Sequence, residues 1–150
     1  MGEASAEVTI VIEKPVSDVF AVMSDYNKNV RWQDGVVESR QITSGAPRVG
    51  TEVSYTRKVA GRKFEAHATI VTLDADAKIR IESKSRMYHY KGGYDFSSTS
   101  DGHTEVHYQG HITTGRLLGM FTQRLADNFA SQMTDDLNRL KRMLEAGTIS

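Results

Sequence analysis

The sequence predicts an α+β fold in which a curved, seven-stranded antiparallel sheet wraps around one long C-terminal helix, with two short helices after the first strand. The stretch 117–145 contains no proline and repeats apolar residues at steps of three or four, which is typical of a long amphipathic helix. Six segments between residues 36 and 114 alternate apolar and polar residues between short turns. Strands that are grouped in this way, with helices outside the group, favour α+β over a parallel sheet.

The chain opens with a strand and two short helices. Residues 7–13 (EVTIVIE) alternate around apolar positions, which predicts a strand, and we expect residues 1–5 to be frayed. Pro15 ends the strand and suits the start of a helix, which the apolar edge of residues 16–23 supports. Residues 26–32 predict a second short helix or a turn.

The middle of the chain predicts an antiparallel meander. Consecutive strands that are joined by short turns, such as the one at Ala60–Gly61, pair antiparallel. We expect strands at residues 36–43, 50–59, 62–73, 78–85, 87–97 and 103–114. All 150 residues are expected to form a single domain.

Composition narrows the classes of function. Lys plus Arg and Asp plus Glu both number 19, and the zero net charge argues against a nucleic-acid partner. The absence of cysteine excludes disulfides, thiolate zinc sites and a cysteine nucleophile. No apolar stretch is long enough to predict an integral membrane segment, and no secretory signal is visible. We therefore expect a cytoplasmic protein that is a monomer or a homodimer.

Short motifs accompany this order of elements along nearly the whole chain. They are residues 14–20 (KPVSDVF), 24–26 (SDY) before Trp32, 49–51 (VGT), 61–62 (GR), 101–104 (DGHT) and 137–141 (LNRLK). Together they resemble the SRPBCC superfamily, also called START-like or Bet v 1-like, and within it the polyketide cyclase/dehydrase group. The resemblance implies the helix-grip fold, with an elongated apolar pocket between the sheet and the long helix.

The inward phase of the strands and one face of the helix supply the residues expected to line such a pocket. The candidate ligand-binding residues are Trp32, Val53, Tyr55, Arg57, Phe64, Ala66, Ile81, Tyr88, Tyr90, Tyr94, Tyr108, Leu118, Phe121, Leu125 and Phe129. The hydroxyl of an inward tyrosine can hydrogen-bond a ligand or act as a general acid, but inward tyrosines also serve as core residues with a satisfied hydroxyl.

Two charged residues interrupt the apolar patterns. Arg57 shares its phase with Val53, Tyr55 and Val59, so its guanidinium either holds a carboxylate or enolate oxygen in the pocket or extends to water. Asp136 falls inside the apolar arc of the helix, where a carboxylate needs partners. We expect Asp136 to have a structural role, such as accepting from a backbone N–H, and to lie away from the pocket mouth.

Metal and nucleophile chemistry lack support in the sequence. His107 and His111 share a strand face but lie about 13 Å apart, too far for one metal ion, and their phase points outward. If Phe96 pairs with Val106, Asp95 lies opposite His107. Without a G-x-S-x-G elbow either, we assign no catalytic residue, metal or cofactor.

The sequence therefore favours binding of a small hydrophobic molecule, such as a lipid, a quinone or an aromatic polyketide, in an internal cavity. An aromatase/cyclase that acts on a poly-β-ketone intermediate is the first alternative, with Arg57 and a tyrosine stabilising the enolate. A protein-interaction module with a small or filled cavity is the second. Whether the protein is an enzyme stays open at this point.

Overall fold

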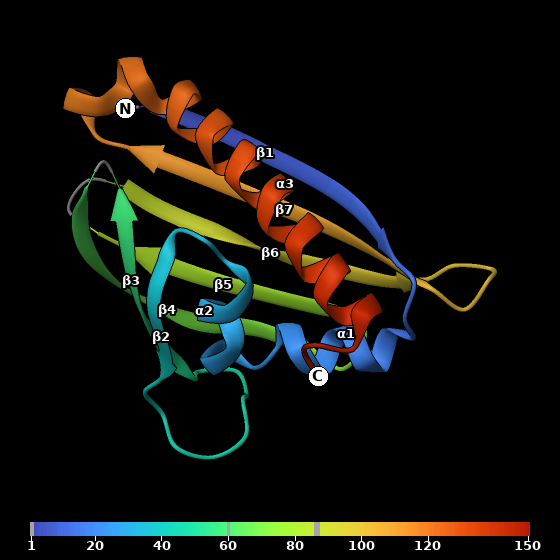
Figure 1. Ribbon diagram of the computed structural model, residues 1–150. Helices are drawn as coiled ribbons and strands as arrows, with labels where there is room; N and C mark the ends of the chain where they lie inside the picture. The colour runs from blue at the N-terminus through green and yellow to red at the C-terminus, as the bar shows by residue number, and fades with distance from the viewer. Residues whose placement is uncertain (1, 60, 86–87) are drawn as a thin grey trace.

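The computed structural model describes residues 2–59, 61–85 and 88–150, which follow the predicted order of elements. The expected turn at Ala60 and the expected strand start at Met87 lie outside the described residues. The elements are β1 (Gly2–Ile12), α1 (Val16–Met23), the 3₁₀ helix η1 (Tyr26–Lys28), α2 (Asn29–Trp32), β2 (Val36–Gln41), β3 (Glu52–Val59), β4 (Arg62–Asp74), β5 (Lys78–Lys84), β6 (Tyr88–Ser98), β7 (Thr104–Thr114), the 3₁₀ helix η2 (Arg116–Phe121) and α3 (Thr122–Ala146) (Figure 1).

The strands form one antiparallel, seven-stranded sheet in the order β1-β7-β6-β5-β4-β3-β2. Consecutive strands from β2 to β7 are neighbours, as the meander predicts, and β1 pairs with β7 from Gly2↔Thr114 to Ile12↔Thr104. The expectation of a frayed start is therefore wrong for residues 2–5. Their backbone groups pair with the end of β7, and Ala4 is buried beside Ile112.

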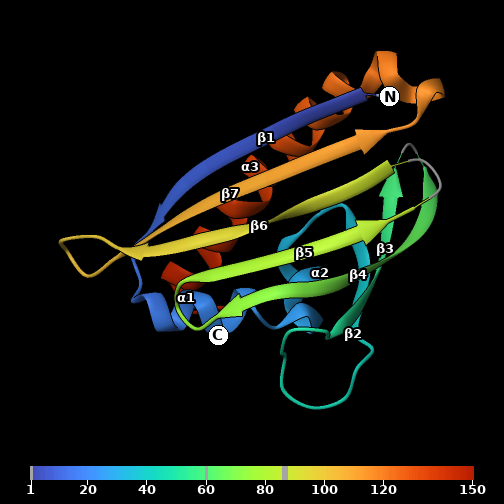
Figure 2. The same cartoon turned by 180° about the vertical axis from the view of Figure 1, so that it is seen from behind.

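The long helix α3 lies across one face of the sheet (Figure 1), and in the opposite view the strands lie in front of it (Figure 2). Its C-terminal half packs most tightly, with Leu137, Leu140 and Leu144 all buried. Gly147 ends the helix at φ 73°, a left-handed conformation that suits glycine, and its N–H bonds to the Leu144 carbonyl. The predicted helix is confirmed, apart from its start.

The α-helix begins at Thr122 and not at Leu117, because residues 116–121 form the 3₁₀ helix η2. The buried Thr122 hydroxyl lies 2.6 Å from the Thr114 hydroxyl at the end of β7 and bonds back to the Leu118 carbonyl at 3.2 Å. These bonds tie the helix start to the sheet, so the residues before Thr122 form a separate segment at the end of the molecule.

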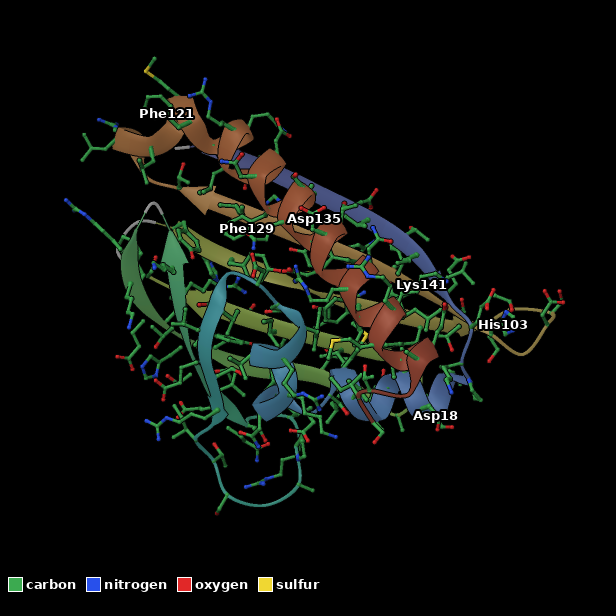
Figure 3. The ribbon with its side chains drawn as sticks, viewed as in Figure 1. Asp18, His103, Phe121, Phe129, Asp135 and Lys141 are labelled. Atoms are coloured by element: carbon green, nitrogen blue, oxygen red, sulfur yellow. The ribbon has the colours of Figure 1, made fainter. Side chains whose placement is uncertain are left out.

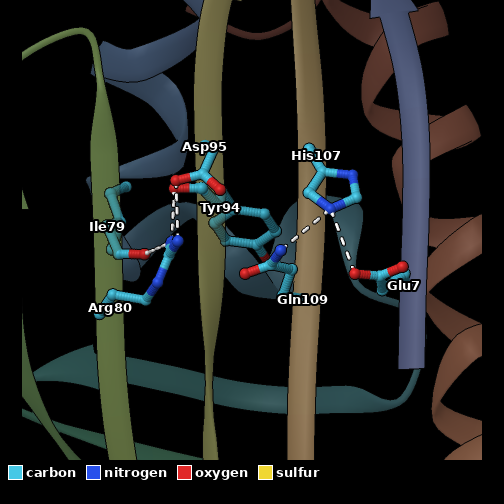
Figure 4. A network of polar contacts seen from close by, with 7 residues as sticks. All are labelled: Glu7, Ile79, Arg80, Tyr94, Asp95, His107 and Gln109. Atoms are coloured by element: carbon cyan, nitrogen blue, oxygen red, sulfur yellow. Dashed lines mark hydrogen bonds and ion pairs between the residues drawn. The ribbon is translucent and has the colours of Figure 1, made fainter. Parts of the chain in front are cut away.

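The face of the sheet opposite α3 carries a polar network (Figure 4). The predicted register is confirmed, with Asp95 opposite His107. Asp95, however, pairs with Arg80 at 2.8 Å, while Nε2 of His107 lies 3.6 Å from the Glu7 carboxylate. His111 also lies on this face and bonds to the Ser5 hydroxyl at 2.9 Å, so neither histidine points toward α3.

Candidate functional site

A small cavity of about 50 Å³ lies between α3 and the inner face of the sheet. Strands β3 to β7 form one wall and the middle of α3 forms the other. The lining residues are Tyr55, Arg57, Ala66, Ala68, Ile81, Ser83, Tyr88, Tyr90, Tyr108, Phe129, Gln132, Met133 and Asp136. The lining is apolar and aromatic with a few polar groups, as is usual for ligand sites.

The structure brings together only part of the candidate set. Tyr55, Arg57, Ala66, Ile81, Tyr88, Tyr90, Tyr108 and Phe129 line the cavity. Trp32, Val53 and Tyr94 are buried in the main core and are not among the lining residues. The others that do not line it are Phe64, Leu118, Phe121 and Leu125. The alternation along the strands therefore predicts the lining residues better than the apolar face of the helix does.

Phe129 marks where α3 covers the cavity. Its ring centroid lies 6.2 Å from that of Tyr88 and 6.0 Å from that of Tyr90, and Figure 3 shows Phe129 directed from α3 toward the sheet. Leu125, one turn earlier, packs against the small cluster of Ala4, Ile112 and Ala126, which Phe129 also contacts, but Leu125 does not line the cavity. Phe121 is 50% exposed because it belongs to η2.

A pair of tyrosine hydroxyls forms the polar floor of the cavity. The hydroxyls of Tyr90 and Tyr108 lie 2.6 Å apart, within hydrogen-bonding distance. Each ring folds back over a glycine in its own strand, Gly92 or Gly110, and a Cβ atom at either glycine would collide with that hydroxyl. Burial raises the pKa of both tyrosines, so both hydroxyls are protonated at neutral pH.

Arg57 supplies the positive charge of the site. Its side chain is half-buried, and its guanidinium carbon lies 5.6 Å from the centroid of the Tyr55 ring, a cation–π distance. Burial raises the pKa of Tyr55, and the Arg57 charge and a hydrogen bond with the Asn29 side chain partly offset the rise. The cavity wall thus offers a cation beside a neutral phenol.

Asp136 reaches the same cavity from α3 although it is only 1% exposed. Its Oδ1 accepts from the Asp34 backbone N–H at 3.1 Å and from Arg139 at 3.1 Å. Burial raises the pKa of Asp136, and these two bonds partly offset the rise. The predicted bond to a backbone N–H is confirmed, and Asp136 also lines the cavity.

Sequence reasoning missed four further lining residues, Ala68, Ser83, Gln132 and Met133. Phe129, Gln132, Met133 and Asp136 follow steps of three, one and three, so they share one face of α3. That spacing was visible in the sequence. The signal is ambiguous, because a polar residue on an otherwise apolar helix face also indicates a structural hydrogen bond or contact with solvent.

Behind Tyr55 the interior has unused hydrogen-bonding capacity. The rings of Tyr26 and Tyr55 lie 6.2 Å apart edge to face. Within the described part of the chain, the Tyr26 hydroxyl, Asn29 Oδ1 and Trp32 Nε1 are buried without a hydrogen-bond partner. Buried polar atoms of this kind usually bond to protein or to ordered water.

A wider depression of about 380 Å³ lies on the opposite face of the sheet. Its rim includes Arg80, Glu82 and Lys91, which pair with acidic or basic neighbours, Lys91 with Glu82 at 3.4 Å. Open walls of paired charges fit a solvated surface better than a ligand site, so the cavity under α3 is the candidate site. Among residues 2–59, 61–85 and 88–150, no three His, Asp or Glu side chains are close enough to share a metal ion.

A curved sheet that grips one long helix over an internal cavity defines the START-like class of ligand-binding folds. Within it, the chain belongs to the family described as polyketide cyclase/dehydrase and lipid transport, whose model matches residues 3–145. No curated protein sequence matches the chain. None of the helices in the described part of the chain is long and apolar enough to cross a membrane.

Solved structures share the fold at low sequence identity. The START superfamily protein of Mycobacterium smegmatis has a TM-score of 0.79 and 10% identity over 93% of this chain and 98% of its own. The Zhui aromatase/cyclase of Streptomyces sp. R1128 has a TM-score of 0.81 and 14% identity over 95% and 94%. The protein TTHA0849 of Thermus thermophilus also scores 0.81, with 14% identity over 96% and 99%. At these identities the likeness is one of fold.

Proposed function

We propose that the protein binds a small hydrophobic molecule that carries an acidic or carbonyl group, in the cavity between α3 and the sheet. The observation that carries the proposal is the lining itself, in which aromatic and aliphatic side chains surround one half-buried guanidinium, that of Arg57. The apolar surface supplies affinity, and the guanidinium can hold a carboxylate or carbonyl oxygen.

Binding requires the cavity to widen, because about 50 Å³ holds no more than one or two water molecules. The α3 wall is the part that yields. Phe129 is only half-buried, and Gln132 beside it on the helix is exposed. The sheet wall, in contrast, is held by ladder hydrogen bonds on both sides of β5 and β6. The ligand thus displaces Phe129 and occupies the space over Tyr88 and Tyr90.

The test uses two fluorescent probes of equal shape, a long-chain fatty acid and its methyl ester. Arg57→Met should weaken binding of the acid by about 1.5–3 kcal/mol, the value of a hydrogen bond to a charged group, and leave binding of the ester nearly unchanged. Arg40→Met, which removes an exposed guanidinium from β2, is the matched control and should change neither affinity.

A cavity-filling substitution provides the second arm. Ala66→Phe places a ring in the space that the ligand needs, so both probes should lose affinity while the protein stays folded. Native mass spectrometry of the freshly purified wild type should show a bound small molecule that Ala66→Phe lacks. Equal loss of the acid and the ester in Arg57→Met would remove the anion-binding role of Arg57.

An aromatase/cyclase activity is the second candidate, and the placement of Arg57 and Asp136 on facing walls of one cavity favours it. In such a reaction an enolate carbon attacks a ketone carbon of the same chain, and loss of water completes the aromatic ring. Arg57 stabilises the enolate oxygen, the neutral Tyr108 hydroxyl donates a hydrogen bond, and Asp136 is placed to exchange a proton. Formation of an aromatic product from a model poly-β-ketone, lost in Arg57→Met, tests this activity.

An interaction module with a filled cavity is the third candidate, favoured by the small volume of the cavity. It requires that neither probe binds and that no small molecule accompanies the purified protein. Binding of either probe, blocked by Ala66→Phe, excludes this third candidate.

A further inference from the structure

The 3₁₀ helix η2 carries the two most exposed large apolar side chains of the described structure, with a third, half-exposed one beside them. Leu117 is 95% exposed, Met120 is 90% exposed and Phe121 is 50% exposed. In a 3₁₀ helix, residues three apart lie on the same side, so Leu117 and Met120 project together, with Phe121 beside them. We call these three residues the apolar tip. A group of exposed apolar side chains of this kind marks an interaction surface.

The apolar tip lies at the end of the sheet where the cavity is covered. Thr114 at the end of β7 pairs with Tyr88 at the start of β6, and the Tyr88 ring contacts Phe129. The β3–β4 hairpin reaches the same end of the molecule, as both ribbon views show (Figures 1 and 2). The apolar tip and the α3 wall that yields are therefore adjacent parts of one chain segment.

Basic side chains are concentrated at this end although the whole chain has no net charge. We call the following exposed residues the basic edge: Lys58 near the end of β3, Arg62 and Lys63 at the start of β4, Lys84 at the end of β5, and Arg116 at the start of η2. Lys58 and Lys63 lie directly opposite each other in the ladder, an arrangement of like charges that is unfavourable without an anion.

Within residues 2–59, 61–85 and 88–150, no ion pair involves a residue of the basic edge. The carboxylates of Glu65 and Glu3, on neighbouring strands, lie 3.1 Å from His67 and 3.7 Å from His111. The end of the molecule thus combines a protruding apolar tip with positive charge on the adjoining hairpin and strand ends.

We propose that this end of the protein docks on the surface of an anionic lipid bilayer. The apolar tip enters the boundary between headgroups and acyl chains, and the basic edge binds the anionic headgroups. A fluid bilayer fits the observations better than a protein partner, because the tip is convex and a bilayer needs no matching shape. Docking places the α3 wall against the membrane, so the cavity loads from the bilayer, a consequence that rests on the proposed function.

The test measures flotation of the full-length protein with vesicles of phosphatidylcholine alone or mixed with phosphatidylglycerol. The wild type should float with the anionic vesicles, weakly with the neutral ones, and less as salt is raised. Leu117→Gln with Met120→Gln should reduce the partition coefficient about tenfold or more, because two apolar side chains no longer enter the bilayer. Lys58→Gln with Lys63→Gln should reduce it by about fivefold per charge.

Two matched controls use the opposite end of the protein. Val49→Gln changes a 62% exposed apolar residue in the β2–β3 loop, and Arg142→Gln changes an exposed cation near the end of α3. Both should float like the wild type. All the substituted residues are exposed, so the variants are expected to fold, and circular dichroism verifies it.

Several results would overturn the docking proposal. One is that the wild type fails to float with anionic vesicles, and another is that it floats equally well with anionic and neutral vesicles. A third such result is that both double variants float as well as the wild type. If sedimentation showed that the wild type is a dimer and that Leu117→Gln with Met120→Gln is a monomer, the apolar tip would contact a second copy of the chain and not a bilayer. Titration of the protein with the fluorescent fatty acid in the absence of vesicles tests the proposed function separately from membrane docking. Flotation without probe binding removes only cavity loading, and probe binding without flotation removes only docking.

Discussion

Replacing one leucine by alanine in each half of α3 compares how much the two halves contribute to stability. Leu137 is fully buried in the main core, whereas Leu125 is half-buried in the small cluster beside the cavity. Removing three buried carbons from Leu137 loses about 2.4 kcal/mol of transfer free energy, and the residual cavity raises the expected cost of Leu137→Ala to about 3–5 kcal/mol.

Leu125→Ala should cost less, about 1.5–2 kcal/mol, because the Leu125 side chain is only partly buried and the neighbouring wall can relax. Urea titrations followed by the fluorescence of Trp32, the single and buried tryptophan, give both free energies of unfolding. Comparable m-values are required for the comparison. Leu117→Ala, at a 95% exposed site, should stay within about 0.5 kcal/mol as a control. Equal losses at Leu125 and Leu137 would refute the idea that the N-terminal half of α3 packs less tightly on the sheet than the C-terminal half.

Three further predictions concern polar groups. Asp136→Ala should destabilise the protein by about 1–3 kcal/mol in urea titrations, because the Asp34 N–H loses its acceptor, and Asp136→Asn should cost less. Because the folded pKa of Asp136 is raised, the wild type should gain stability relative to Asp136→Asn as pH falls from 7 through that pKa, and a constant difference would contradict this. Tyr108→Phe should cost about 1–3 kcal/mol by leaving the buried Tyr90 hydroxyl unpaired, and the double change to phenylalanine should cost less than the sum of the two single changes, as a double-mutant cycle would show. His107→Gln and His111→Gln should each change stability by less than about 0.5 kcal/mol at pH 7, and a larger loss would mean that their bonds to β1 hydroxyls matter.

Long-range pairing limited what could be predicted about the chain ends. The polar start of β1 has no strong apolar alternation of its own, and it is ordered because β7 offers an unpaired edge from Thr104 to Thr114. A tertiary contact also decides where α3 begins. The apolar periodicity continues through Leu118 and Phe121, but the bond between Thr122 and Thr114 sets where the helix meets the sheet.

The sequence by itself determined the elements and the direction of most side chains. Periods of 2 and 3.6 residues are local properties, so they placed Tyr55, Tyr90 and Tyr108 on the inner face of the sheet and His107 on the outer face. They also predicted the long helix and the α+β arrangement, because an apolar face must be buried against another element.

Only the tertiary structure decided which inward residues meet. The contact between the hydroxyls of Tyr90 and Tyr108 depends on the pairing of Gly92 with Gly110, and the placement of Asp136 across from Arg57 depends on the angle at which α3 crosses the sheet. Curvature and crossing angle arise from packing summed over many residues, which no local period encodes. The same packing turned residues 116–121 away from the core, so that Phe121, which the helical pattern placed on the buried face, is 50% exposed and belongs to the apolar tip.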